Sequence, residues 1–392
     1  MKISKIDVVG YPKLNNFKTK NCINSNTQIN GSNELSNLFG ASFGLFFEGT
    51  KTVHLNENEA ALEKDIVQKA RSLGVSTPEI KDNTYTLSGK TADINSNPIT
   101  QEHIENVLNN ILIMDKAGFA HGDIEKAHVF YCKDGSVEFD CFRFNWTFDD
   151  TERVDWEFPK FCYPTNLKQF EGNSVGEYLT QMNTEEKKYG FLKSYLEKCS
   201  DFHSKRADFI EESKPNAQAQ VEYEKLQAKM FENPDRNTVE LFKNKIELLY
   251  KARLAFTEWD EGNGACGHKI DEKRMIKSVC MNFEIISDTL DYIKKIEESK
   301  KSSKGDKLRY LEYELEYAHD ILKKTKDSNA GMANWTIDPD NPNSTVHKNI
   351  ASDVREDFME KSEGLKNTDT KDKDFEAKAK QLQKMYLDFL CK

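Results

Sequence analysis

The spacing of apolar residues changes near residue 150, and no other feature of the chain constrains its fold as strongly. Before that point, strand-length runs of apolar and aromatic residues alternate with two amphipathic helix patterns, at 57–73 and 101–117. Beyond it, apolar residues recur every three or four positions, most clearly at 307–323 and again at 375–389. This is the period of a helix that buries one face. The sequence therefore predicts an α+β protein in which a mixed N-terminal part is followed by an all-α helical domain.

Two polar stretches indicate where the domains begin and end. Residues 13–37 are dominated by Asn, Ser, Thr and Lys, and such a segment buries too little apolar surface to offset the entropy of ordering it. The segment SKPNAQAQ at 213–220 has the composition of a linker. These features divide the chain into a flexible leader (1–37), a mixed domain (38–212), the linker (213–220) and a helical domain (221–392).

Composition argues against several classes of protein. The chain has 56 basic and 66 acidic side chains, which gives a net charge of −10, and a general nucleic-acid binder needs a basic face instead. The chain contains no run of 18 apolar residues, so we expect no membrane span. Its eight cysteines are scattered without a C-x-x-C motif, which indicates reduced thiols in a cytosol-like compartment rather than a disulfide scaffold.

The segment 119–146 carries the pattern that is most informative about function. A His-Gly-Asp tripeptide at 121–123 follows the second helix pattern, and two predicted strands joined by a short turn come after it. His128 opens the first of these strands, and Asp140 ends the second. Because strands are rigid supports for carboxylates at loop tips, we expect this hairpin to fix the separation of Asp123 and Asp140. Two carboxylates held in this way suit phosphoryl transfer, which needs positioning and charge neutralisation more than covalent help.

This segment resembles the catalytic and metal-binding loops of the protein-kinase-like fold. The His-Gly-Asp tripeptide stands where kinases carry H-R-D and is the form used by aminoglycoside phosphotransferases. Asp140 begins the Asp-Cys-Phe sequence that stands where kinases carry D-F-G. The resemblance implies a two-lobed kinase-like domain in which Asp123 and His121 are the catalytic residues, with Asp123 orienting the acceptor hydroxyl. It also implies that Asp140 and His128 contact the metal ion, Mg²⁺ or Mn²⁺, that accompanies ATP.

Upstream, the order of elements is similar to that of a kinase N-terminal lobe. A predicted hairpin containing glycines stands where kinases fold a glycine-rich loop over the nucleotide phosphates, and the helix pattern at 57–73 corresponds to helix αC. By strand alternation we expect Val53 to point inward and His54 to face the nucleotide, while Glu63 (or Glu59) faces that strand. The nucleotide-binding residues that the resemblance implies are Gly40, Ser42, Gly44, His54 and Glu63.

The chain departs from the kinase pattern at several positions. His54 replaces the expected lysine, and Lys51 and Lys90 are alternative sources of that positive charge. His128 replaces the magnesium-binding asparagine, and an imidazole suits transition metals better than Mg²⁺. Phe142 stands where kinases carry the glycine of D-F-G. These departures are compatible with three classes of protein: a weakened kinase, a nucleotide-binding pseudokinase, and a kinase fold used for another transfer reaction.

The function that we expect first is the transfer of phosphate from ATP to a hydroxyl group of a host or cellular protein. The small catalytic part and the Ser/Asn-rich leader are similar to the minimal kinases that bacteria inject into host cells. This similarity implies a type III effector that acts in virulence, made in the bacterial cytoplasm and secreted into the host cell. Two alternatives stay open: a pseudokinase-type scaffold that binds partners through the helical domain, and a small-molecule phosphotransferase.

We expect the remaining clusters of polar residues to lie on the solvent-exposed surface. His203, together with Lys205 and Arg206, is typical of an exposed helix face, and the Lys-rich run at 294–307 alternates in charge as a solvent-facing helix end does. Cys199 and His203 lack a second Cys/His pair at the spacing of a zinc site, so no zinc site is predicted there.

Overall fold

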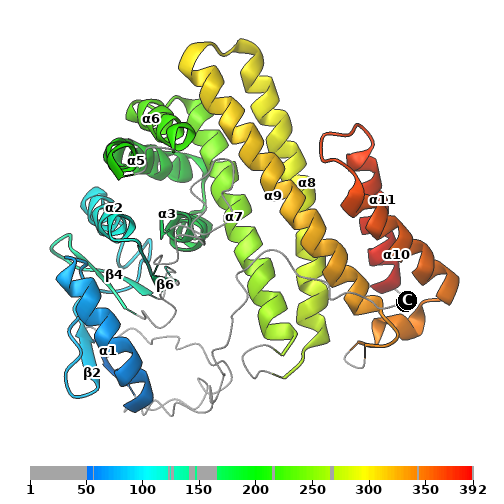
Figure 1. Cartoon of the computed structure of the whole chain (residues 1–392), viewed down its shortest axis with the longest axis horizontal. Helices are drawn as coiled ribbons and strands as arrows, with labels where there is room; N and C mark the ends of the chain where they lie inside the picture. The colour runs from blue at the N-terminus through cyan, green and yellow to red at the C-terminus, as the bar shows by residue number, and fades with distance from the viewer. Residues whose placement is uncertain are drawn as a thin grey trace. The chain divides into compact units, whose positions relative to one another are not determined.

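The computed structural model describes most of the chain beyond residue 50. Contacts divide it into two compact units, one of which covers the described residues up to 240 and the other those from 241 onward. Helices occur in both units, and the three antiparallel sheets of the described residues belong to the first (Figure 1). The predicted α+β class is therefore confirmed. The described residues are 51–55, 57–121, 124, 128–140, 146–147, 166–213, 217–264, 269–341 and 344–390.

The strands of the first unit are short and pair two by two. They are β1 (Lys51–His54), β2 (Thr84–Leu87), β3 (Phe119–Ala120), β4 (Val129–Tyr131), β5 (Val137–Phe139) and β6 (Trp146–Thr147). β1 pairs with β2, β3 with β6, and β4 with β5, each antiparallel. The β4–β5 hairpin confirms the two strands that the sequence predicted between His128 and Asp140. The hairpin predicted upstream of residue 50 lies outside the described residues.

The first two helices of the first unit begin and end close to the predicted positions, 57–73 and 101–117. The helices of this unit are α1 (Glu57–Ser72), α2 (Gln101–Lys116), α3 (Asn166–Gln169), the π-helical turn η3 (Phe170–Val175), α4 (Gly176–Thr180), α5 (Glu185–Ser213) and α6 (Gln218–Glu232). Thr100 caps α2, because its side chain accepts a hydrogen bond from the backbone N–H of His103. The predicted apolar face of α2 is buried: Ile104, Val107, Leu108, Ile111 and Met114.

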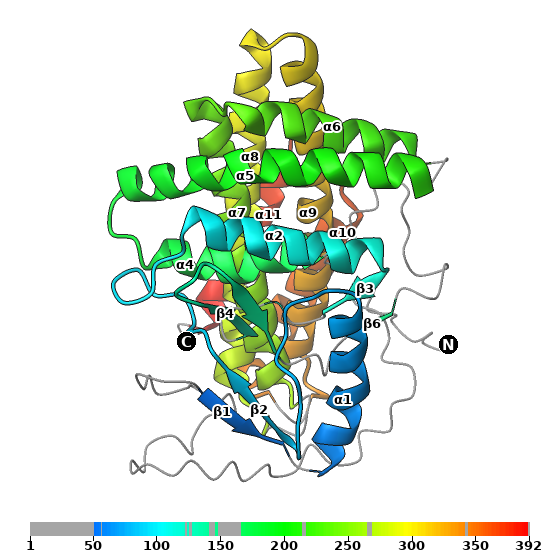
Figure 2. The same ribbon diagram turned by 90° about the vertical axis from the view of Figure 1, so that its left-hand side faces the viewer.

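The boundary between the two units differs from the predicted linker at 213–220. It falls between Glu240 and Leu241, within α7 (Arg236–Gly262). The physical reason is that α6 packs along α5, as Figure 2 shows, and Val221 shares a buried apolar cluster with Ile210. α5 ends at Ser213 and α6 begins at Gln218, so the predicted linker joins two helices that pack against each other.

The second unit is helical throughout its described residues. After α7 it contains α8 (Glu272–Ser302), α9 (Gly305–Ile337), the 3₁₀ turn η5 (Val346–Asn349), α10 (Ser352–Asn367) and α11 (Phe375–Leu390). α8 and α9 pack against each other along their length (Figure 1). The predicted apolar stripe of the last helix is fully buried: Phe375, Ala379, Leu382, Tyr386 and Phe389. Such stripes fold this unit because each helix must cover its apolar face.

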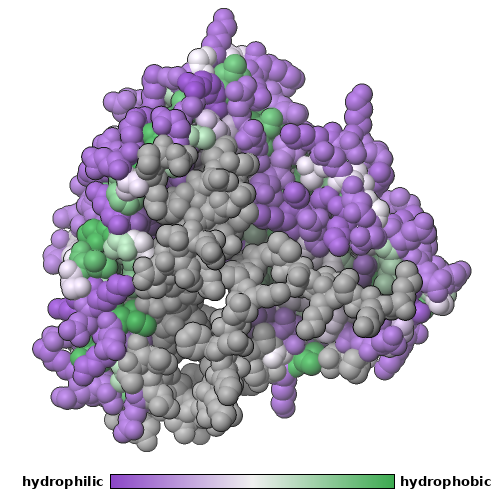
Figure 3. Space-filling view, in the orientation of Figure 1, coloured by the Kyte–Doolittle hydropathy of each residue, from purple (hydrophilic) through white to green (hydrophobic). Residues whose placement is uncertain are grey.

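The surface of the described residues is mostly hydrophilic on the face shown in Figure 3, with apolar residues scattered across it. The large apolar side chains that are exposed belong to the second unit: Phe256, Ile270, Met359 and Leu387. In agreement with the sequence, none of the helices in the described part of the chain is long and apolar enough to cross a membrane.

Gly135, in the turn between β4 and β5, gives a first testable prediction. Its φ of +84° is disfavoured for other residues, and an added Cβ would overlap the carboxyl group of Glu102. We expect Gly135→Ala to lower the free energy of unfolding by about 1–3 kcal/mol in urea titrations. Gly190→Ala is the control, because Gly190 lies in α5 with no atom near its added Cβ, and it should stabilise by about 0.5–1 kcal/mol. Equal effects of the two substitutions would contradict the prediction.

Candidate functional site

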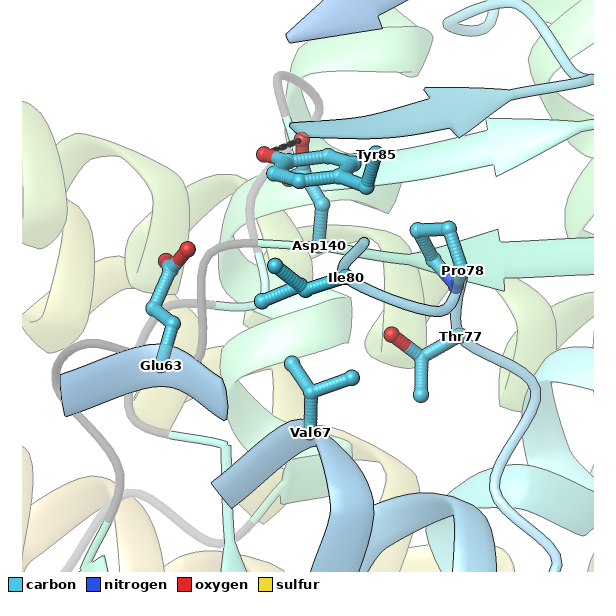
Figure 4. A pocket seen from close by; sticks show the side chains of 7 residues that line it. All are labelled: Glu63, Val67, Thr77, Pro78, Ile80, Tyr85 and Asp140. Atoms are coloured by element: carbon cyan, nitrogen blue, oxygen red, sulfur yellow. Dashed lines mark hydrogen bonds between the residues drawn. The ribbon is translucent and has the colours of Figure 1, made fainter. Parts of the chain in front are cut away.

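Asp140 borders a small cleft in the first unit, directly after the last residue of β5 (Figure 4). One wall comes from α1, and the rest comes from β2 and from the segment that precedes it. The cleft is lined by Glu63, Val67, Thr77, Pro78, Ile80, Tyr85 and Asp140. The sequence predicted two of these residues, Glu63 and Asp140, as members of one site, and the structure brings them to the same cleft.

The carboxylate of Asp140 is held by two hydrogen bonds. The hydroxyl of Tyr85 donates to its Oδ2 over 3.2 Å, and Nδ1 of His128 lies 2.7 Å from its Oδ1. His128 directly precedes β4, and Val129 pairs with Phe139 in the hairpin, so the strand register itself places residues 128 and 140 side by side. The side chains of His128 and Asp140 are 17% and 6% exposed. The predicted pair of metal ligands therefore lies together at the edge of the cleft.

Glu63 approaches this cleft from α1. Its side chain is almost fully buried, and Val67 lies one helical turn further along the same face. Burying a carboxylate costs free energy unless the group has a polar or charged partner. A buried glutamate is therefore a candidate member of the site. Glu59, the alternative in the sequence, has a side chain outside the described residues.

His121 lies in the interior beside this site. Its side chain is fully buried, and its ring centroid is 5.9 Å from that of Phe139. Burial, together with the nearby His128, lowers the pKa of His121 to about 3. The negative charge of Asp140 and a hydrogen bond between the Asp140 backbone and the His121 ring act in the opposite direction but are weaker. The ring is therefore neutral near pH 7. The His121 side chain faces away from solvent and packs beside Phe139, which directly precedes Asp140.

His54 is not brought to the cleft. In the β1–β2 ladder it pairs with Thr84, whereas Val53 pairs with Tyr85. Paired residues of an antiparallel ladder point to the same face, and Tyr85 faces Asp140, so the cleft side of β1 is that of Val53. His54 is exposed on the opposite face. Val53 therefore points inward as expected, but the inner side is also the side of the cleft, so His54 does not face the cleft as expected.

Several predicted residues lie outside the described part of the chain. They are Gly40, Ser42, Gly44 and Asp123. The residues on both sides of the His-Gly-Asp loop are described, however, and their contacts show how the loop is anchored. The backbone N–H of His121 donates to Oδ1 of Asn166 over 2.9 Å, and that of Ile124 donates to Oε1 of Gln169 over 3.2 Å.

A buried charged network, which the sequence did not predict, lies behind this loop. Arg206 Nη1 lies 2.8 Å from Glu224 and its Nε lies 3.3 Å from Asp115, while Nδ1 of His203 is 2.7 Å from Glu224. His203 and Arg206 were expected on an exposed helix face, and this expectation is wrong, because they are 2% and 6% exposed. Their spacing from Cys199 places them on the buried stripe of α5, which was the available signal.

The pKa values in this network follow from burial and charge. Burial raises the pKa of Asp115, although Arg206 and the hydrogen bond from Asn166 oppose that change. Burial also acts to raise the pKa of Glu224, but Arg206 and His203 outweigh it and hold the pKa below its usual value. Arg206 is therefore the cation that makes two buried carboxylates tolerable.

The described cleft offers a limited set of donors for a metal ion or a nucleotide. Asp140 and His128 supply one carboxylate and one imidazole, and no group of three or more potential metal ligands occurs within the described residues. Of the two ions that the sequence implied, an imidazole ligand favours Mn²⁺, because imidazole prefers transition metals. The cleft has a volume of about 10 Å³, enough for about one water molecule and far below the roughly 300–1,000 Å³ of most ligand pockets. Residues 40–44 and 122–123, which the sequence assigns to the same site, lie outside the described residues.

Comparisons of this chain with protein-family models, with curated proteins and with solved structures found no match.

Proposed function

We propose that this chain is a divergent kinase-like protein that transfers a phosphoryl group from ATP to a hydroxyl of a host or cellular protein. The observation that supports the proposal is that Asp140 and Glu63 line one cleft and His128 contacts Asp140, beside the buried His121 that stands two residues before Asp123. A helix, a His-Gly-Asp loop and a hairpin ending in a carboxylate follow one another in the order found in kinases. The proposal includes a two-lobed arrangement of residues 38–212 around this cleft.

The proposed reaction assigns a role to each of these side chains. The acceptor oxygen forms a bond to the γ-phosphorus of ATP, the bond from that phosphorus to the β–γ bridging oxygen breaks, and ADP leaves. Asp123 orients the acceptor hydroxyl and takes its proton. Asp140 and His128 would hold Mg²⁺ or Mn²⁺, which neutralises phosphate charge when bound. Glu63 would orient a lysine toward the phosphates, and Lys51 and Lys90 are the candidates.

A second function, that of a pseudokinase-type scaffold, is favoured by two specific observations. Both carboxylate oxygens of Asp140 already accept hydrogen bonds, from Tyr85 and from His128. In addition, His54 points away from the cleft instead of supplying charge to it. A scaffold of this type would bind a nucleotide or none and would contact its partner through the helical unit from 241 onward.

The test combines nucleotide binding with phosphate transfer. Thermal shifts with ATP and either Mg²⁺ or Mn²⁺ report binding, and radiolabelled ATP reports transfer to the protein itself or to added protein. We expect Asp123→Ala to reduce transfer by about 10²–10⁴-fold, since it removes the base, and Asp140→Ala to reduce it to background. Asp65→Ala, at an exposed position of α1, is the control and should stay within about twofold of wild type.

Each outcome separates the candidate functions. Transfer that both aspartate substitutions leave unchanged would overturn the kinase assignment. Binding of ATP without transfer by the wild type would support the pseudokinase scaffold. Transfer to small hydroxyl compounds but not to proteins would support the small-molecule phosphotransferase instead. Mn²⁺ that stabilises the nucleotide complex more than Mg²⁺ would agree with His128 as a ligand.

A further inference from the structure

The helical segment from α3 to η3 contacts the backbone on both sides of the His-Gly-Asp loop. Asn166 accepts from the N–H of His121 over 2.9 Å, and Gln169 accepts from the N–H of Ile124 over 3.2 Å. Nδ2 of Asn173 donates to the carbonyl of Ile124 over 3.3 Å. Three amide side chains spaced by three and four residues lie on one face of a helix. The loop is thus fastened at both ends by one short segment.

The helix that carries these amides contains the π-helical turn η3 (Phe170–Val175). A π turn admits one extra residue per turn and is most frequent at functional sites. Asn173 lies within this turn, and Gln169 directly precedes it.

Asn166 is itself held by the buried charged network. Its Nδ2 donates to Oδ1 of Asp115 over 3.0 Å, and Asp115 Oδ2 lies 3.3 Å from Arg206 Nε. Arg206 in turn binds Glu224 from α6, which also contacts His203. Because each member is buried and joined to the next by a hydrogen bond or an ion pair, the amide of Asn166 has one orientation, with its oxygen toward His121 and its nitrogen toward Asp115 and the carbonyl of Phe119.

We propose that Asn166, Gln169 and Asn173 form an amide clamp that holds the backbone of His121 and Ile124, the described residues on either side of Gly122 and Asp123. These three are positioning residues, since they contact the backbone of the loop. The effect on the loop stands by itself, and the effect on phosphate transfer rests on the proposed function. The clamp is completed by Asp115, which fixes the orientation of Asn166.

The test moves the negative charge of Asp115 to position 166 and the amide of Asn166 to position 115. Asn166→Asp keeps the oxygen that accepts from His121 but places a second carboxylate oxygen against Asp115. The double variant Asp115→Asn/Asn166→Asp restores a donor between the two positions and conserves the net charge. It also leaves an amide oxygen toward Arg206. Asn109→Asp, at an exposed position of α2, is the matched control.

Amide hydrogen exchange, followed by mass spectrometry on peptides that cover 119–124, gives a readout that is independent of activity. We expect Asn166→Asp to raise the exchange rate of these peptides by about tenfold or more, with the peptides of β1 and β2 unchanged, and the double variant to recover most of the protection. If Asn166→Asp does not fold, Asn173→Ala removes one bond at a half-buried position and should raise the rate by about threefold or more.

Transfer kinetics then separate this inference from the proposed function. Where the wild type transfers phosphate, Asn166→Asp should lower kcat by about 10²-fold with KM for ATP within about threefold, because the misplaced group is the base. Unchanged exchange at 119–124, an equal rise across the whole unit, or no recovery in the double variant would overturn the clamp. Absence of transfer by the wild type, with the exchange results as expected, would overturn the proposed function and leave the clamp standing.

Discussion

Replacing Arg206 with methionine is expected to lower the free energy of unfolding by about 3–5 kcal/mol at pH 7. The guanidinium is 6% exposed and contacts the carboxylates of Asp115 and Glu224, so its removal leaves two buried anions without their shared cation. Methionine retains much of the volume of the arginine side chain. The loss of stability should therefore come mainly from the missing charge and not from a cavity. Urea denaturation of the wild type and the variant measures the difference.

The loss caused by Arg206→Met should depend on pH in a known direction. In the wild type, Arg206 helps to hold the pKa of Glu224 below its unfolded value near 4.5, so this stabilisation is present above that pH and is lost below it. Without the guanidinium, burial raises the pKa of Glu224 above the unfolded value, which penalises folding at neutral pH and ceases to do so in acid. The difference between wild type and variant is therefore largest at pH 7. It shrinks as the pH falls, first through the raised pKa of Glu224 in the variant and then, below about 4.5, through the lowered pKa of Glu224 in the wild type.

Lys205→Met provides a control at the neighbouring position. The Lys205 side chain is 49% exposed and pairs with Asp201 within the same helix, and exposed pairs of this type contribute about 0–1 kcal/mol. We expect a change within about 0.5 kcal/mol. A loss for Arg206→Met that is no larger than that of Lys205→Met, or that is constant between pH 4 and pH 7, would contradict the role of Arg206 as a shared cation.

These two adjacent residues also show what sequence reasoning missed. Lys205 and Arg206 carry the same charge, and charge alone suggested one exposed face. The helical period separates them, because Arg206 lies three residues after His203 and four before Ile210, on the buried stripe of α5. A basic residue on an apolar stripe predicts a buried partner. The identity of that partner, Glu224 in another helix, depends on tertiary packing.

The parts of the fold that depend on local signals could be predicted. The apolar period located α2 and α11, and the turn after β4 located the hairpin that brings His128 and Asp140 together. Alternation placed Val53 inside and His54 on the opposite face, but it could not show on which side of β1 the cleft lies. That choice is made by the pairing of Val53 with Tyr85, a long-range contact.

In the second unit, replacing Glu314 with leucine is expected to lower the free energy of unfolding by about 3–5 kcal/mol. Glu314 in α9 is 1% exposed and accepts from Nζ of Lys245 in α7 over 3.1 Å and from the hydroxyl of Tyr292 in α8 over 2.9 Å. The ammonium also lies 4.8 Å from the ring centroid of Tyr317. The substitution removes the acceptor that three helices share and leaves a buried cation without its carboxylate. Urea denaturation measures the loss.

The triple variant Lys245→Met/Tyr292→Phe/Glu314→Leu distinguishes charge from shape. It removes the cation and the hydroxyl donor together with their acceptor, and buried ion pairs replaced as a set by apolar groups are often neutral or stabilising. We therefore expect the triple variant to lie within about 1–2 kcal/mol of wild type. Glu312→Leu, two residues away with a side chain that is 55% exposed, should change stability by less than about 0.5 kcal/mol. A triple variant as unstable as Glu314→Leu would show that shape, and not the unbalanced charge, dominates at this position.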